Sequence, residues 1–104
     1  MSSMTLDELH GHLADMTDDE VILDVRTPEE FAEGHIAGAI NISHTEVGER
    51  LDELSDYTKV YIICKRGGRA KQAFSEAQCE RKGFYCIYDA GMDAWQERGY
   101  PVTQ

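Results

Sequence analysis

Apolar residues form two patterns that alternate along the chain. Short continuous apolar runs at 21–25, 60–64 and 84–88 predict buried strands, and residues 39–42 predict a further short strand. Between these runs, apolar residues recur every three or four positions, which is the spacing of one helix face. The pattern therefore predicts strands that alternate with helices.

Two segments carry the start signal of a helix known as a capping box. In this signal a threonine and a glutamate three residues later satisfy each other's backbone N–H groups. Thr5 with Glu8 and Thr27 with Glu30 both fit it. The first box precedes leucines at helical spacing, which predicts a helix over about 5–14.

Three more helices follow from spacing alone. They are expected over about 45–54, over a face marked by residues 70–77, and around 94–98, where Gly99 ends the last one. Strands joined to helices by short loops predict the α/β class, with a mainly parallel central sheet flanked by helices on both faces. The length suits one domain spanning residues 1–104.

Charge narrows the classes of partner. The chain carries a net charge of −10 at pH 7, and residues 1–58 hold fifteen acidic and two basic side chains. A surface of this sign disfavours nucleic acid and anionic membranes as partners. No apolar run is long enough to cross a bilayer and no secretion signal is visible at the N-terminus, so a cytoplasmic protein is expected.

Cysteine usage gives no sign of a disulfide framework or a metal site. The three cysteines are Cys64, Cys79 and Cys86, and no two of them stand in a CxxC pattern. The histidines also lack a metal-ligand spacing with them, so no metal is expected.

The segment from 64 to 69 holds the strongest candidates for catalytic and ligand-binding residues in the chain. It reads Cys64, Lys65, Arg66, Gly67, Gly68 and Arg69. It is predicted to join the end of a buried strand to the start of a helix, where free backbone N–H groups and the helix dipole attract anions. Adjacent glycines allow the loop to curl into an anion-binding nest. Together with the cations, these features favour a cysteine thiolate that acts as a nucleophile beside a docking place for an anionic substrate.

Three motifs in this order resemble one known family. The first spans 24–31 and 34–42, the second is the loop 64–69, and the third spans 91–95 and 99–102. Together they resemble the rhodanese-like sulfurtransferases in their small single-domain form, and the resemblance covers nearly the whole chain. It implies a three-layer sandwich around a parallel sheet.

The resemblance also implies a reaction. In this family the Cys64 thiolate would attack the outer sulfur of a small anionic donor such as thiosulfate, form a persulfide and release sulfite. A thiol acceptor, either a small thiol or a carrier protein, would then take the sulfur, as would cyanide. Backbone N–H groups from Lys65 to Arg69 would hold the anionic persulfide. The resemblance implies no metal and no organic cofactor.

Two other functions remain open on the same fold. One is a non-catalytic anion-binding or regulatory module, although such modules usually lack the cysteine present at Cys64. The other is an arsenate reductase or phosphatase, which in related proteins has a loop one residue longer than the six residues seen here.

Several further residues have a structural interpretation in the sequence. Asp24 and Arg26 are expected to fix a strand-to-helix turn by hydrogen bonding, and the His35 ring is expected to bond to nearby backbone. Trp95 and Cys86 are expected in the core. Cys79 is expected to point away from its helix's apolar face, toward water.

Overall fold

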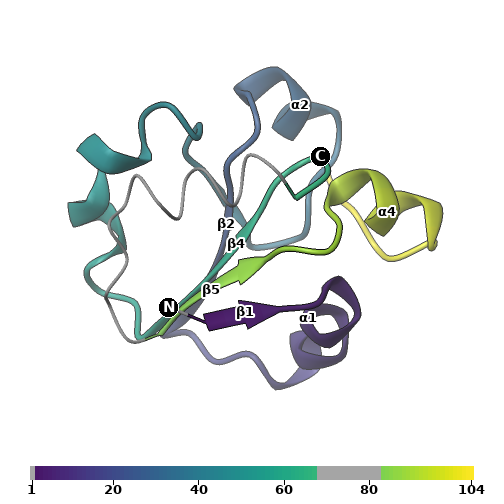
Figure 1. Ribbon diagram of the computed structural model, residues 1–104, viewed down its shortest axis with the longest axis horizontal. Helices are drawn as coiled ribbons and strands as arrows, with labels where there is room; N and C mark the ends of the chain where they lie inside the picture. Colours follow the sequence, from purple (N-terminus) through teal and green to yellow (C-terminus); the bar gives the residue numbers. More distant parts are fainter. Residues whose placement is uncertain (1, 68–82) are drawn as a thin grey trace.

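All five strands of the sheet run parallel in the computed structural model, which describes residues 2–67 and 83–104 (Figure 1). The strand order is β1-β5-β4-β2-β3. The strands are β1 (Ser2–Met4), β2 (Glu20–Asp24), β3 (Ile40–Asn41), β4 (Lys59–Ile63) and β5 (Phe84–Ile87). This arrangement confirms the predicted α/β class with its parallel sheet.

Helices cover both faces of the sheet, as the sequence predicted. The described helices are α1 (Leu6–His12), α2 (Pro28–Glu33) and α4 (Met92–Glu97), with 3₁₀ turns η1 (Leu13–Asp15), η2 (Val47–Glu49) and η3 (Leu51–Leu54). In Figure 1, α1 and α4 lie on one side of the strands and the teal 3₁₀ turns lie on the other. Among the described residues, no helix has both the length and the apolar character needed to span a membrane.

The two faces of the sheet have separate apolar cores. Alternate residues of a strand point to opposite faces, so Val60 and Ile62 of β4 pack toward η2 and η3, while Tyr61 and Ile63 pack toward α1 and α4. The central strand β4 is therefore apolar at nearly every position. This double burial explains why the sequence shows continuous apolar runs in place of an alternating pattern.

Both predicted capping boxes are present. The Thr5 side chain accepts the Glu8 N–H while the Glu8 carboxylate accepts the Thr5 N–H, and Thr27 and Glu30 form the same pair at the start of α2. The first helix ends earlier than expected, because its last turn tightens into η1. The other predicted strands and the last helix lie where the pattern placed them, within one or two residues at each end.

The predicted helix over 45–54 is wrong. This segment forms the two 3₁₀ turns η2 and η3, with hydrogen bonds such as the Arg50 N–H to the Val47 carbonyl. Gly48 and Val47 both have low helix propensity, and Glu46, Glu49 and Glu53 would stack like charges three and four positions apart. The apolar side chains Val47 and Leu54 still reach the core, so the spacing was informative even though the helix type was not.

One strand was not predicted, and one helix lies outside the described residues. Strand β1 consists of Ser2–Met4, whose two serines carry no apolar signal, and it pairs with β5 at the edge of the sheet. The predicted helix at 70–77 falls within 68–82, as do Gly68, Arg69 and Cys79.

Candidate active site

Cys64 stands at the carboxyl edge of the sheet, directly after the central strand β4. Its side chain is fully buried, and its Sγ accepts a hydrogen bond from the backbone N–H of Gly67 at 2.8 Å. The chain therefore turns back on itself within three residues. The glycine-rich sequence predicted backbone N–H groups directed toward the cysteine, and the Gly67 N–H is one such donor.

Gly67 is required by two features of its surroundings. Its φ is +103°, a conformation that residues with a Cβ rarely adopt. A Cβ at this position would also lie 2.9 Å from the carbonyl oxygen of Tyr88. The turn that follows Cys64 is thus packed directly against the segment that follows β5.

Helix α4 is attached to the cysteine segment through its backbone. The N–H of Met92 donates to the carbonyl of Cys64 at 2.8 Å, and the N–H of Asp93 donates to the carbonyl of Lys65 at 3.1 Å. The buried Trp95 ring holds the other side of the helix, where its Nε1 donates to the carbonyl of Pro101. Two segments that lie far apart in the chain, 64–67 and 91–95, therefore form one structural unit.

The charges at this unit differ from the sequence expectation. Lys65 and Arg66 line a shallow cavity of about 320 Å³, as expected for cations near the cysteine. The same cavity is also lined by Asp93 and Glu97 of α4, and Arg66 Nε donates to Asp93 Oδ2 at 3.1 Å. The sequence reasoning missed these carboxylates. Their signal was their spacing, because both follow Gly91 at positions that share one helix face.

Comparisons with known proteins identify the family of this chain. The model of the rhodanese-like domain family matches residues 5–98. The chain belongs to the rhodanese-like domain family. Its parallel sheet with flanking helices is the fold that the resemblance implied.

Three relatives illustrate how similar the chain is to known rhodanese-like proteins. A protein of Allochromatium vinosum named sulfurtransferase is 31% identical over 97 residues, which cover 93% of this chain and 90% of the relative. A chloroplastic thiosulfate sulfurtransferase of Arabidopsis thaliana is 33% identical over 94 residues, with 77% of each chain covered. A solved rhodanese-related protein of Thermoplasma volcanium superposes with a TM-score of 0.83 at 29% identity, covering 99% and 98% of the two chains.

Asp24 and Arg26 of the rhodanese-like domain form a buried ion pair that fixes the end of β2. Arg26 Nη2 lies 2.7 Å from Asp24 Oδ2 and also donates to the carbonyl of Gly34 at 2.7 Å. The expected structural role of this pair is confirmed. The His35 ring likewise contacts backbone, since its Nδ1 lies 2.8 Å from the carbonyl of Phe31.

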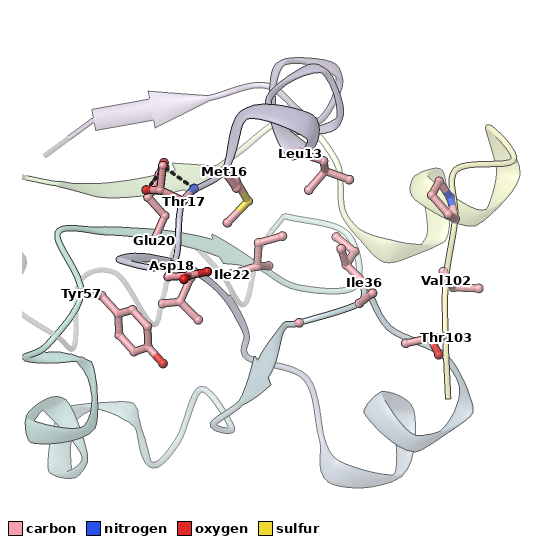
Figure 2. Close-up of a pocket in the computed structure, with 14 residues that line it drawn as sticks. Leu13, Met16, Thr17, Asp18, Glu20, Ile22, Ile36, Tyr57, Val102 and Thr103 are labelled. Atoms are coloured by element: carbon pink, nitrogen blue, oxygen red, sulfur yellow. Dashed lines mark hydrogen bonds between the residues drawn. The ribbon is translucent and has the colours of Figure 1, made fainter.

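A second cavity of about 480 Å³ lies apart from the cysteine. Figure 2 shows the apolar side chains Leu13, Met16, Ile22 and Ile36 gathered around it. It borders the amino end of β2, whereas Cys64 follows the carboxyl end of β4. Among residues 2–67 and 83–104, neither a cysteine nor a cation lines it, so these residues offer none of the chemistry found at the cysteine segment.

Glu20 at the rim of this second cavity anchors a hydrogen-bonded cluster. Its carboxylate accepts from the Tyr61 hydroxyl at 2.5 Å and from the Thr17 N–H at 3.0 Å, and it lies 2.8 Å from His12 Nε2. Burial raises the pKa of Glu20, but the hydrogen bonds from Tyr61, His12 and Thr17 outweigh it and hold the pKa at about 2. Burial and the Glu20 carboxylate in turn raise the pKa of Tyr61. Glu20 is thus a charged part of the scaffold.

Proposed function

We propose that this rhodanese-like domain is a sulfurtransferase whose sulfur carrier is Cys64. Sulfane sulfur passes from thiosulfate or a similar small anionic donor to Cys64, and then to a thiol of a small molecule or carrier protein. Cyanide serves as acceptor in an assay. The names of the relatives, sulfurtransferase and thiosulfate sulfurtransferase, support the reaction class.

One observation carries the proposal: the Gly67 N–H donates to the buried Cys64 Sγ at 2.8 Å. A backbone donor that already points at the sulfur stabilises negative charge there without reorganisation. The same kind of donor stabilises the anionic persulfide that sulfur transfer requires. We include Lys65, Arg66, Gly68 and Arg69 in the proposed binding loop on the basis of the sequence.

The proposed first half-reaction balances without a cofactor. The Cys64 thiolate attacks the outer sulfur of thiosulfate, a new S–S bond forms, and the old S–S bond breaks with its electron pair leaving on sulfite. In the second half-reaction an acceptor thiolate attacks the outer sulfur of the persulfide and restores the Cys64 thiolate. A cytoplasmic setting is part of the proposal, because a reducing compartment keeps the nucleophilic thiol free.

The test is an intact mass spectrum of reduced protein after brief treatment with thiosulfate. The wild type is expected to gain one sulfur atom that cyanide removes, and Cys64→Ala is expected to gain none. Cys86→Ala is the matched control, because Cys86 is also buried yet lies within β5. Sulfur on a residue other than Cys64 would refute the assigned carrier.

Other substrates separate the competing functions in the same assay series. A folded protein that gains no sulfur from thiosulfate, mercaptopyruvate or a small persulfide is no sulfurtransferase. Turnover of arsenate or of a phosphate ester by that protein would assign it to the reductases or phosphatases. Anion binding without any turnover would assign it to the regulatory modules.

A further inference from the structure

The second cavity, at the amino end of β2, has an apolar interior that is open to solvent. Its volume of about 480 Å³ is ample for a large apolar side chain, and Figure 2 shows apolar groups from three segments around it. Ile22 and Ile36 are buried at its floor, whereas Val102, which also lines it, is 45% exposed. A molecule that arrives from solvent can therefore reach apolar surface that the fold itself leaves uncovered.

Hydrogen bonds hold the walls of this cavity in place. On one side, Thr103 and His35 exchange two backbone hydrogen bonds, of 2.9 Å and 2.7 Å. On the other side, the Glu20 N–H donates to the Thr17 carbonyl at 3.0 Å, and the Thr17 N–H donates to the Glu20 carboxylate at 3.0 Å. The cavity is thus formed before any ligand binds, which lowers the entropic cost of binding.

The interior of the cavity offers little to a polar ligand. The Glu20 carboxylate already accepts hydrogen bonds from Tyr61 and Thr17. Within residues 2–67 and 83–104, the one buried side-chain polar atom without a hydrogen-bond partner is His44 Nδ1, and His44 does not line the cavity. An apolar group is therefore the part of a ligand that fits the interior.

The surroundings of the cavity are acidic. The segments that line it contain four carboxylates and no lysine or arginine; these segments are 13–22, 36–38, 57 and 101–103. The carboxylates belong to Asp15, Asp18, Asp19 and Glu20, of which Asp18 and Glu20 line the cavity itself. Asp15, Asp18 and Asp19 are exposed. Several carboxylates beside one apolar cavity match a ligand that carries several positive charges around an apolar group.

We propose that the second cavity is a docking site for a basic segment of a partner protein. The segment inserts one large apolar side chain into the cavity and places lysine or arginine side chains beside Asp18 and its acidic neighbours. A buried apolar anchor with charges around it is a common way for protein segments to bind. Because Cys64 follows the carboxyl end of β4, the docking site is separate from the cysteine, and this inference does not rest on the proposed function.

The test is a titration of the isotope-labelled protein with a peptide probe, followed through backbone amide shifts in two-dimensional NMR spectra. The probe is Lys-Lys-Leu-Lys-Lys with both ends blocked, at low salt. We expect shifts at Met16, Ile36 and Val102, which line the cavity. Replacing the leucine of the peptide by glycine should weaken binding by about tenfold or more, because the apolar anchor is lost. Replacing its lysines by glutamates should abolish binding.

Two variants of the protein test the two parts of the docking site. Asp18→Asn should weaken binding of the probe by about twofold to fivefold, the size of an exposed ion pair. Asp52→Asn is the matched control, because Asp52 is exposed in η3, which supplies no lining residue, and it should bind like the wild type. Ala37→Trp should abolish binding, since Ala37 is exposed at the cavity and a bulky ring there fills it.

Four outcomes would overturn the proposal. Shifts confined to other residues, or none at all, would show that the cavity does not bind the probe. Equal binding of the leucine and glycine peptides would leave charge alone as the cause. Leucine amide that binds as tightly as the peptide would make this a site for small apolar amines. Shifts of the cavity amides with protein concentration alone would identify a second copy of the chain as the occupant.

Discussion

A Cβ atom on Gly91 would stand 2.2 Å from the carbonyl oxygen of Cys64 and 2.5 Å from that of Lys65. Glycine at this position thus lets α4 press its backbone onto the cysteine segment. Because the overlap is with backbone, Gly91→Ala must push the two segments apart. We expect Gly91→Ala to lose about 1–3 kcal/mol of unfolding free energy, measured by urea denaturation. We also expect it to lose most of its sulfur uptake.

Gly11→Ala is the control for Gly91→Ala. No atom lies within 4 Å of the position of its Cβ, and Gly11 lies within α1, where alanine is favoured by about 1 kcal/mol. It should stabilise the protein. Equal stability of the two variants would show that the contact at Gly91 has no energetic weight.

Gly67 and Gly38 separate the cost of backbone conformation from the cost of contact. Both have positive φ, +103° and +84°, but only Gly67 has a neighbour within reach of a Cβ, the Tyr88 carbonyl. Gly38→Ala should cost about 1–2 kcal/mol from conformation alone. Gly67→Ala should cost more in urea denaturation and should also slow persulfide formation. A greater loss in Gly38→Ala would contradict the contact.

Removing one partner of the buried pair of Asp24 and Arg26 should strongly destabilise the fold. Arg26→Met leaves the Asp24 carboxylate without its counter-charge in an environment with almost no exposure, which costs about 3–5 kcal/mol. Replacing both residues, as in Asp24→Leu/Arg26→Met, should recover much of that loss. Urea denaturation of the two variants tests the pair, and a double variant less stable than Arg26→Met would overturn the argument.

Glu20 should contribute to the acid sensitivity of the fold. Its pKa in the folded protein is about 2, below the ordinary value of 4.5, so folding favours its ionised form. This stabilisation is complete above the unfolded pKa and is lost as the pH falls from there toward about 2. Glu20→Gln should therefore lose less stability than the wild type between about pH 7 and about pH 3, as read from urea midpoints. Glu29→Gln, at an exposed position, should show the same pH dependence of the urea midpoint as the wild type. The same pH dependence in Glu20→Gln would refute the role of Glu20 in acid sensitivity.

Local signals in the sequence were sufficient for much of the fold. The capping boxes at Thr5 and Thr27 and the apolar runs of β2, β4 and β5 depend on neighbours within a few residues, and the structure confirms them. Strand β1 was not predictable in this way. Its serines gain their strand conformation from pairing with β5, more than eighty residues away.

In the candidate site, too, the sequence predicted the residues that are adjacent in the chain and missed those brought in by tertiary contact. The cysteine, its glycine turn and its flanking cations are adjacent in the chain, so their order alone indicated a thiol in an anion-binding loop. The carboxylates of Asp93 and Glu97 reach that loop only because the α4 backbone bonds to Cys64 and Lys65. The spacing of Asp93 and Glu97 shows that they share one helix face, but no local signal shows that this face meets the loop. The roles of Cys64 and of its loop remain predictions for the assays above.

The pairing of Ser2 with Tyr85 sets an order for events during synthesis on the ribosome. Strand β1, the first of the five strands in chain order, is among the last to find its partner, since β5 is made long after β1. The inner strand β4 likewise waits for β5 on one side while it joins β2 on the other. Contacts this distant in sequence slow folding, because a long stretch of chain must close before they form. Strand β1 therefore cannot pair until β5 has been made, and the sheet is completed only after that point.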